Sequence, residues 1–414
     1  MKNKPKAHAP TRSQYSVLRQ VCNYIPEFLV PRLAEQHGVD AKARSFSPWS
    51  HVVSLIHSQL THAIGLNDVC DGLRLHCGPL SALRGATPPS RNNLSHANKV
   101  RDAAMAEALF WAVLSHLQEL HPEFAGSRKG KGLLRRFKRT IHAVDSTTIQ
   151  LVANCVDWAR HRRRKAAAKC HVRLDLQSFL PRLVIIDTAK QHDNRRAREL
   201  CADLKAGEVV VFDKAYLDFS HLRDLGQRDV FWVTRARSDQ QCLVRKRCAA
   251  SASENIVGDE IVEMEGPRSR QRHPGPLRRV TADVEVDGRM MEMTFLTNNT
   301  EWSAQTIADL YRSRWQIEVF FKQMKQTLQL SDFLGQSANA VRWQVWVALL
   351  VYVLLRFLAC LSEWEHSFTR LWALVRSCLW DRIDLLAELR ACGTAGGHFR
   401  LLGRPEAAYL PGFG

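Results

Sequence analysis

Apolar positions in the first third of the chain recur every three or four residues. From Tyr15 to about Leu120 this spacing is that of amphipathic helices with one buried face. Gly78-Pro79 and Pro88-Pro89 interrupt the pattern and divide it into separate helices. We therefore predict an all-α N-terminal domain over residues 1–125, followed by a basic, glycine-bearing linker from Ser127 to Lys138.

The pattern changes at Arg139, where β-branched residues become frequent. Two helices are expected, at Asn194–Leu204 and near Phe219–Leu225. The expected strands are Thr140–Val152, Val172–Leu176, Leu183–Ile186, Glu208–Phe212 and Val230–Thr234. Three strands followed by helix, strand, helix and strand are typical of a mixed α/β sheet. We assign the first part of such a core to residues 139–237.

Helical periodicity is lost after Ser238 and returns at Trp302. Strand-like stretches in between predict a β-rich insertion over residues 238–300. Helices then continue to about Arg390, and we assign residues 301–392 to the C-terminal helices of the core. The glycine-rich residues 393–414 are expected to form a flexible, dispensable tail.

The charge balance changes this picture by pointing to a partner. Lys and Arg number 59 against 41 Asp and Glu, a net charge of +18. Such a surplus favours a polyanion, either nucleic acid or an anionic membrane. Eleven cysteines without a CxxC pair and a polar N-terminus indicate reduced thiols in the cytoplasm. The apolar run Val345–Leu361 is interrupted by Arg356, so we predict a buried helix rather than a membrane span.

Two aspartates lie in or directly after predicted strands of this core, and the second of them is placed where such a sheet commonly binds ligands. Asp145 lies in the first strand, within HAVDSTTIQL, and Asp213 directly follows the apolar run Val209–Phe212. Carboxylates at the C-terminal ends of buried parallel strands commonly face a ligand site. The alternative for each is a structural role, because Asp often ends a strand or caps a turn.

A third acid belongs to a more specific pattern. Tyr311, Arg314, Glu318 and Lys325 follow one another at intervals of three, four and seven residues. On a continuous α-helix, at about 100° per residue, they share a stripe roughly 60° wide. An ordinary solvated Arg–Glu pair remains the alternative. The neighbouring Phe320 and Phe321 favour a buried helix that lines a charged site.

This set of side chains suits the cleavage of a phosphodiester. Two Mg²⁺ ions about 3.5–4 Å apart activate water and stabilise the leaving oxygen, and carboxylates are their preferred ligands. Arg314 and Lys325 cannot bind cations and are expected to hold phosphate. Tyr311 can donate a hydrogen bond to phosphate or stack on a base.

The motifs also resemble those of a known family. YRSRWQIEVFFKQMK, residues 311–325, resembles the Tyr-Arg-Glu-Lys signature of the insertion-sequence-four family of bacterial DDE transposases, with all its spacings. HAVDSTTIQL and VVFDKAYLDFSHL resemble its first- and second-Asp blocks, with Tyr216 at the expected aromatic position. The 105 residues from Asp213 to Glu318 match the β-rich domain that members of this family carry before the last acid. The segment RSFSPWSHVVSLIHSQLTHAIGLNDVCDGL is similar to an N-terminal domain of some members.

The resemblance implies a ribonuclease-H-like fold in which Asp145, Asp213 and Glu318 hold two Mg²⁺ ions, with Mn²⁺ as a substitute. It also implies cut-and-paste transposition of an insertion sequence, through a hairpin intermediate in the better-understood members. The expected partners are the DNA of the transposon ends and the target, and a second copy of the chain in a synaptic homodimer. The expected location is the bacterial cytoplasm, at the nucleoid, without a membrane.

Further candidates for DNA contact are basic segments. The run Arg160–Lys169 contains Arg162, Arg163 and Arg164, which are expected to bind phosphate unless the run is a solvated loop. Ser90–Arg101 is a candidate groove-facing helix, with an exposed polar helix start as the alternative. Asp187, His192 and Asp193 lie near the core strands, where a hydrogen-bonded structural pair is the simpler interpretation.

Two alternative functions remain open at this point. One is a stand-alone metal nuclease that cuts DNA without joining strands. The other is a domesticated DNA-binding protein without catalysis, which loss of an acid would favour. All three acids are present.

Overall fold

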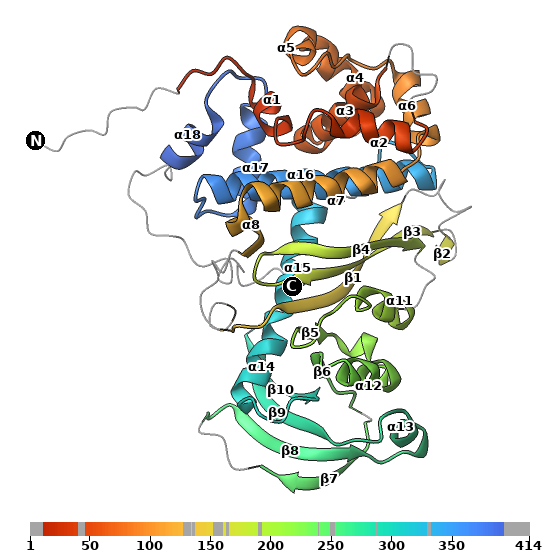
Figure 1. The fold of residues 1–414 in the computed structure, drawn as a ribbon, viewed down its shortest axis with the longest axis vertical. Coiled ribbons are helices and arrows are strands. Elements are labelled where there is room, and N and C mark those ends of the chain that lie inside the picture. The colour runs from red at the N-terminus through yellow and green to blue at the C-terminus, as the bar shows by residue number, and fades with distance from the viewer. Residues whose placement is uncertain are drawn as a thin grey trace, which may run out of the picture.

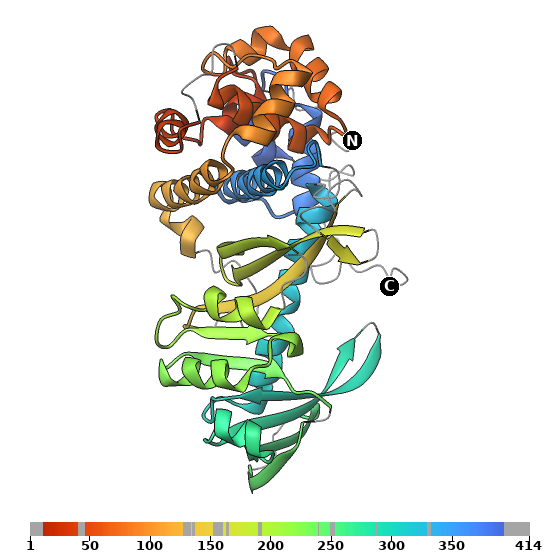
Figure 2. The same cartoon turned by 90° about the vertical axis from the view of Figure 1, so that its right-hand side faces the viewer.

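The computed structural model has three parts stacked along its long axis, with a helical layer, a sheet with flanking helices, and a β-rich end (Figure 1). The view turned by 90° keeps the same order (Figure 2). The structure describes residues 11–39, 46–126, 134, 137–151, 160–162, 165–188, 193–238, 240–248, 253–286, 288–328 and 333–392.

The N-terminal region is helical, as the sequence predicts. Its helices are α1 (Val17–Cys22), α2 (Leu29–Gln36), α3 (Pro48–Thr61), α4 (Leu66–Leu75), α5 (Cys77–Ser81), α6 (Arg91–Val100), α7 (Ala104–Leu120) and α8 (Pro122–Gly126). Serine side chains cap several of them: Ser16 accepts from Arg19 N, Ser47 from Ser50 N and Ser90 from Asn93 N. Each cap satisfies a backbone donor that the first helical turn leaves without a partner.

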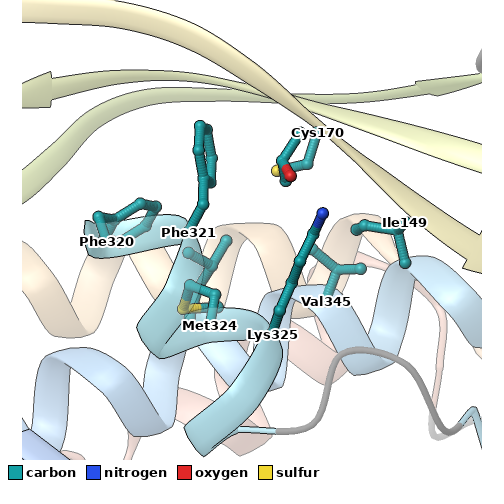
Figure 3. Close-up of a pocket in the computed structure, with 9 residues that line it drawn as sticks. Ile149, Cys170, Phe320, Phe321, Met324, Lys325 and Val345 are labelled. Atoms are coloured by element: carbon teal, nitrogen blue, oxygen red, sulfur yellow. The ribbon is translucent and has the colours of Figure 1, made fainter. Parts of the chain in front are cut away.

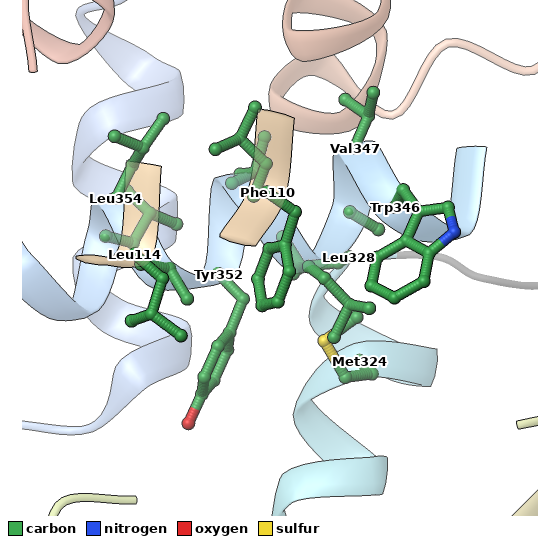
Figure 4. Packing of buried hydrophobic residues seen from close by; sticks show 14 of the residues in the cluster. Phe110, Leu114, Met324, Leu328, Trp346, Val347, Tyr352 and Leu354 are labelled. Atoms are coloured by element: carbon green, nitrogen blue, oxygen red, sulfur yellow. The ribbon is translucent and has the colours of Figure 1, made fainter. Parts of the chain in front are cut away.

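The last three helices of the chain pack into this layer. They are α16 (Ala338–Leu361), α17 (Phe368–Ser377) and α18 (Leu385–Ala391). Figure 4 shows Phe110 and Leu114 of α7 beside Trp346 and Leu354 of α16, within one hydrophobic cluster. The N-terminal helices therefore share a core with the C-terminal ones, although more than 200 residues separate Leu120 from Ala338.

Helix α16 is long and apolar enough to cross a bilayer by composition alone. In the structure, 78% of its most apolar window is buried inside the protein. Arg356, which interrupts the run, lies over the ring of Phe179. The predicted buried helix is confirmed.

A ten-stranded mixed sheet forms the rest of the core. Its order is β2-β3-β1-β5-β6-β10-β9-β8-β7, with β4 paired to β3. The strands of the first part are β1 (Ile141–Leu151), β2 (Arg160–Arg162), β3 (Lys165–Asp175), β4 (Leu180–Thr188), β5 (Val209–Phe212) and β6 (Phe231–Arg235). β1 pairs antiparallel with β3 and parallel with β5, which in turn pairs parallel with β6. This is the mixed α/β core predicted from the order of elements.

Helices cover both faces of this sheet. Helices α11 (Asp193–Leu200) and α12 (Phe219–Gln227) pack with Val210 and Phe212 in one cluster. Helices α14 (Ala304–Ser313) and α15 (Trp315–Lys322) pack with Val209 and Val211 in the other. Successive residues of a strand point to opposite faces, which explains why the four buried residues of β5 serve two clusters.

The β-rich insertion continues the core sheet instead of forming a second one. It contains β7 (Cys242–Arg247), β8 (Ile256–Met264), β9 (Leu277–Val286), β10 (Arg289–Thr297) and the short helix α13 (Pro267–Arg272). Strand β10 pairs antiparallel with β6, with Leu296 opposite Thr234. The chain then enters α14, so the insertion brings the third acid back to the sheet.

Candidate active site

Asp145 and Asp213 lie next to each other on neighbouring strands. β1 and β5 are parallel and Val144 pairs with Phe212, so each acid is the next residue of its strand. Neighbouring strands lie about 4.8 Å apart, which brings the two backbones close at this point. Asp213 also caps a short 3₁₀ turn, η2 (Lys214–Tyr216). The register of two strands thus brings together acids that are 68 residues apart.

Both aspartates face α14 and α15. Ala143 and Val211, two residues before the acids, belong to the cluster that contains Ile317 of α15. Residues two apart in a strand share a face, so Asp145 and Asp213 point to the same side. The helix that carries Glu318 therefore lies over the two acids of the sheet.

Two side chains of this helical segment, those of Tyr311 and Arg314, contact the acids. Tyr311 Oη donates to Asp213 Oδ1 at 3.3 Å. Arg314 donates from Nη1 to Asp145 Oδ2 at 3.0 Å and from Nη2 to Glu318 Oε1 at 2.8 Å. The Arg314 side chain is only 11% exposed, against 20% for Asp145 and 34% for Glu318. The structure thus brings together five of the residues selected from sequence.

Burial strongly affects ionisation in this cluster. Desolvation raises the pKa of Asp145 to about 6, with Asp213 and Glu318 adding to the rise and Arg314 opposing it. Burial also raises the pKa of Tyr311 to about 12, so its hydroxyl keeps its proton at neutral pH and donates to Asp213. The carboxylates therefore form a crowded negative site that a cation stabilises.

The donor set suits a hard divalent cation, because carboxylate oxygens are the ligands that Mg²⁺ prefers. Within the described ranges, no group of three or more His, Cys, Asp or Glu side chains is close enough to hold a metal ion. The guanidinium of Arg314 bridges Asp145 and Glu318 and supplies the positive charge there. The residues fit a metal in type, while Arg314 engages two of the three carboxylates.

Lys325 does not join this cluster. The chain is not one α-helix from Tyr311 to Lys325, since it is interrupted at Arg314 and ends in a π-helical turn, η3 (Gln323–Thr327). Lys325 lies in this π turn, about two turns beyond Glu318 along the helix axis. Lys325 instead lines a small apolar pocket with Ile149, Cys170 and other residues (Figure 3). Desolvation lowers its pKa.

Tyr216 is also away from the acids. It is 1% exposed and belongs to the cluster on the face of α11 and α12. Its ring lies 6.2 Å from that of Phe212 at an interplanar angle of 29°. The structure therefore places Tyr216 in the core beneath η2, where it supports the turn after Asp213.

Several basic candidates cannot be compared with the structure. Arg163 and Arg164 lie outside the described residues, as does His192, and only the backbone of Arg162 is described, in β2. Asp187 forms an ion pair with Arg196 at 2.5 Å, which agrees with a structural role. The tail, residues 393–414, lies outside the described residues.

Arg235 is a site residue that sequence reasoning missed. Phe212 pairs with Thr234, so Arg235, the last residue of β6, lies level with Asp213, the residue after β5. Val233 belongs to the cluster on the helix side, so Arg235 points towards α14, where its charge lowers the pKa of Tyr311. The sequence does contain a signal for Arg235, because a basic residue directly follows the next predicted strand, at the edge of the sheet where the acids lie.

Comparisons with known proteins find transposases similar to this chain. The family described as "Transposase DDE domain" matches residues 136–354, and a "Domain of unknown function (DUF4372)" matches residues 13–83. One similar protein is y4zB of Sinorhizobium fredii, which is named as a transposase. The two sequences are 32% identical over 303 residues, a stretch that covers 72% of this chain and 80% of y4zB. The transposase InsG for insertion sequence element IS4 of Escherichia coli is 26% identical over 193 residues, 44% of this chain and 42% of its own. A cryo-EM structure of a piggyBac transposase synaptic complex with hairpin DNA covers 94% of this chain and 85% of its own, with TM-score 0.46 and 9% identity.

Proposed function

The chain belongs to the bacterial insertion-sequence-four family of DDE transposases, and on this premise we propose that it cuts DNA at the ends of an insertion sequence and joins the freed ends to target DNA. The DNA would be the element's terminal inverted repeats and a target duplex. The reaction would take place in the bacterial cytoplasm, within a homodimer that holds two ends together.

One observation carries the proposal. Asp145 and Asp213 follow equivalent positions of two parallel strands, and Glu318 of α15 is linked to Asp145 through the guanidinium of Arg314. Three carboxylates from distant parts of the chain are thus gathered at one edge of the sheet. Burial raises the pKa of Asp145, and the neighbouring Asp213 and Glu318 add to the rise. Strongly shifted carboxyl groups of this kind are typical of functional sites.

We assign Asp145, Asp213 and Glu318 as ligands of two Mg²⁺ ions, which Mn²⁺ can replace. When bound, the ions supply an activated hydroxide and stabilise charge on the leaving oxygen. The same chemistry then serves strand joining, with a 3′-hydroxyl as the attacking group.

In this scheme Arg314 can pair either with the carboxylates of the chain or with a phosphate of the DNA. In the free protein it bridges Asp145 and Glu318. When metals take those oxygens, its planar fork is free to hold a backbone phosphate in a bidentate manner. Metal and DNA would therefore favour each other's binding, because the phosphate offers Arg314 a new anionic partner.

Tyr311 and Arg235 extend the phosphate-binding edge. Tyr311 stays protonated at neutral pH and positions Asp213 through its hydrogen bond. Arg235 forms no ion pair within the described part of the chain, so its guanidinium is available to a phosphate beside Asp213. For Lys325, a phosphate contact remains a proposal that requires the side chain to leave its apolar pocket.

The test is a cleavage and joining assay on linear DNA that carries an element end, with Mg²⁺, Mn²⁺ or EDTA. We expect metal-dependent nicking at the end of the repeat and transfer of the 3′-end to a second duplex. Cleavage without joining would identify a stand-alone nuclease. Binding without either reaction would contradict the enzymatic assignment.

A further inference from the structure

Helix α6 presents two contrasting faces in the helical layer. Leu94, Ala97 and Asn98 are buried, with at most 4% exposure. Five exposed side chains form a polar arc on the opposite face: Arg91, Asn92, Ser95, His96 and Lys99, with the exposed Asn93 and Val100 beside this arc. At about 100° per residue these five span an arc of roughly 140°. The arc contains no acid and combines cations with side chains that both donate and accept hydrogen bonds.

The buried face holds the helix through a polar contact as well as apolar ones. Asn98 Oδ1 lies 2.8 Å from His51 Nε2 of α3. Complete burial lowers the pKa of His51 to about 3, so the ring is neutral and donates from Nε2. The same ring lies 4.5 Å from that of Trp343 on α16. The helix is thus joined to both α3 and α16.

The C-terminal end of α6 is attached to the core of the catalytic part. Asn339 Nδ2 donates to the carbonyl oxygens of Asn98 and Arg101, at 2.9 and 2.6 Å. Trp343 Nε1 donates to the Arg101 oxygen at 2.8 Å. Further along α16, Val345 lines the pocket of Lys325. A surface held in this way loses little freedom on binding, which favours affinity.

The charges of this face contrast with those of another basic helix, α11. There Arg196 pairs with Asp187 and Glu199, and Arg198 pairs with Asp224. Arg91, His96 and Lys99 form no ion pair in the described part of the chain. Cations that are paired within the chain attract an outside anion weakly, whereas those of the α6 face form no ion pair in the described part of the chain.

We propose that this exposed face of α6 reads the transposon end by lying in the major groove of the DNA. The inference rests on the proposed function and adds the surface that recognises the end. A ten-residue helix is about 15 Å long, and the major groove admits one α-helix. Asn92 and His96 are one turn apart and reach base edges, while Lys99 contacts the phosphate backbone.

Two acids of α4 set the direction of the DNA. Asp68 lines a cleft together with Arg91, and Asp71 acts with Arg91 on the same buried thiol, Cys70. Phosphates are therefore repelled at the α4 side of the helix. The backbone passes instead along the side of Lys99, which has no acid on its own helix.

The experiment measures DNA binding by the full chain in EDTA, so that no strand is cut. Fluorescence anisotropy compares a duplex carrying the element's own terminal repeat with a shuffled duplex of equal length. The double variant Asn92→Ala, His96→Ala should bind the repeat roughly tenfold more weakly and the shuffled duplex equally well. Lys99→Gln should weaken both and reduce the salt slope by about one.

A matched control removes one exposed charge elsewhere. Arg195→Gln on α11, on the other side of the sheet, should leave the preference for the repeat unchanged. The α6 side chains are exposed, so equal thermal stability of the variants is expected and is measured alongside. A folded double variant that keeps the full preference would overturn the proposal. A wild-type chain without any preference would refute end recognition itself, and this inference with it.

Discussion

The catalytic edge of the sheet and the exposed face of α6 are both charged, but they differ in where their counter-charges lie. At the edge, Arg314 lies between Asp145 and Glu318 and is 11% exposed. On α6, Arg91 and Lys99 are exposed and form no ion pair in the described ranges. The charges of the catalytic edge are paired within the chain, whereas the cations of the α6 face are exposed to solvent.

The difference follows from burial. Unpaired ions in a desolvated site cost several kcal/mol, so three crowded carboxylates need an internal cation until metals arrive. Exposed cations stay hydrated, so they pay no such desolvation cost and need no internal ion pair before DNA binds. We infer that the ion pairs of Arg314 belong to a site where metal ions can replace the arginine. The unpaired cations of α6 belong instead to a surface that binds DNA.

The largest expected effect comes from removing an acid. Asp145→Asn, Asp213→Asn and Glu318→Gln should each lower the cleavage rate by at least about a thousandfold, because all three serve one metal site. The losses should not add in double variants, since the first change already disables the site. Single-turnover cleavage of an end-bearing duplex measures this.

These variants also test the separation of the two regions. Each should bind the terminal repeat within about twofold of wild type, because α6 remains intact. Conversely, the α6 double variant should bind Mn²⁺ normally. A large loss of DNA affinity in the acid variants, with the fold preserved, would show that the two regions are not independent.

The next effect concerns Arg314 and has opposite signs in two assays. Arg314→Ala should tighten Mn²⁺ binding to the free protein by roughly tenfold, because it removes a cation that pairs with Asp145 and Glu318. It should also slow cleavage by about a hundredfold, through the lost phosphate contact. Calorimetric Mn²⁺ titration and single-turnover assays measure the two effects.

Two variants sharpen this result. Arg314→Lys keeps the charge without the fork and should recover part of the cleavage rate. Arg235→Ala should slow cleavage while leaving Mn²⁺ affinity nearly unchanged, because Arg235 pairs with no carboxylate in the described residues. If Arg314→Ala instead weakened Mn²⁺ binding, the bridging arginine would be an aid to metal binding and not its competitor.

Much of the fold was readable because its signals are local. The buried run Val209–Phe212 and the serine-capped helix starts are visible in short stretches of sequence. Glu318 and Arg314 were identified by their spacing, and Asp145 and Asp213 by their places in and after predicted strands; the structure links Arg314 to Asp145 and Glu318. Their assignment as metal ligands stays a prediction, as does the role of each base.

Two kinds of feature could not be predicted from the sequence. One is contact between residues far apart in the chain, and the other is a change from one helix type to another. The chain forms a π turn at Gln323–Thr327, and a constant 100° step anticipates neither this turn nor the apolar pocket that Lys325 lines. Arg235 directly follows the predicted strand Val230–Thr234, but its place beside Asp213 depends on the pairing of Phe212 with Thr234. The sharing of one core by α7 and α16 also depends on tertiary packing between distant segments.

A smaller effect concerns pH and the ionisation of Asp145. Its pKa is about 6 in the folded protein and near 3.8 in the unfolded chain. The metal-free protein should therefore lose roughly 2–3 kcal/mol of unfolding free energy as pH rises from about 4 to 6, and little more above it. Asp145→Asn lacks this titration, so its stability relative to wild type should increase over the same range. Denaturation in EDTA at several pH values measures both proteins; a constant difference would contradict the raised pKa.

The smallest effect tests Lys325, a half-buried cation that belongs to neither region. It pairs with no carboxylate in the described residues and lies among apolar side chains such as Ile149 and Phe321. Lys325→Met replaces the amine with a thioether of similar shape, so unfolding free energy should change by less than about 1 kcal/mol. The exposed Lys322 on the same helix provides the matched control, Lys322→Met. If Lys325 turns out to hold phosphate in the complex, Lys325→Met alone should reduce the salt slope of DNA binding by about one. A loss of several kcal/mol would show that the amine stabilises the free protein, and an unchanged salt slope would remove Lys325 from the phosphate contacts.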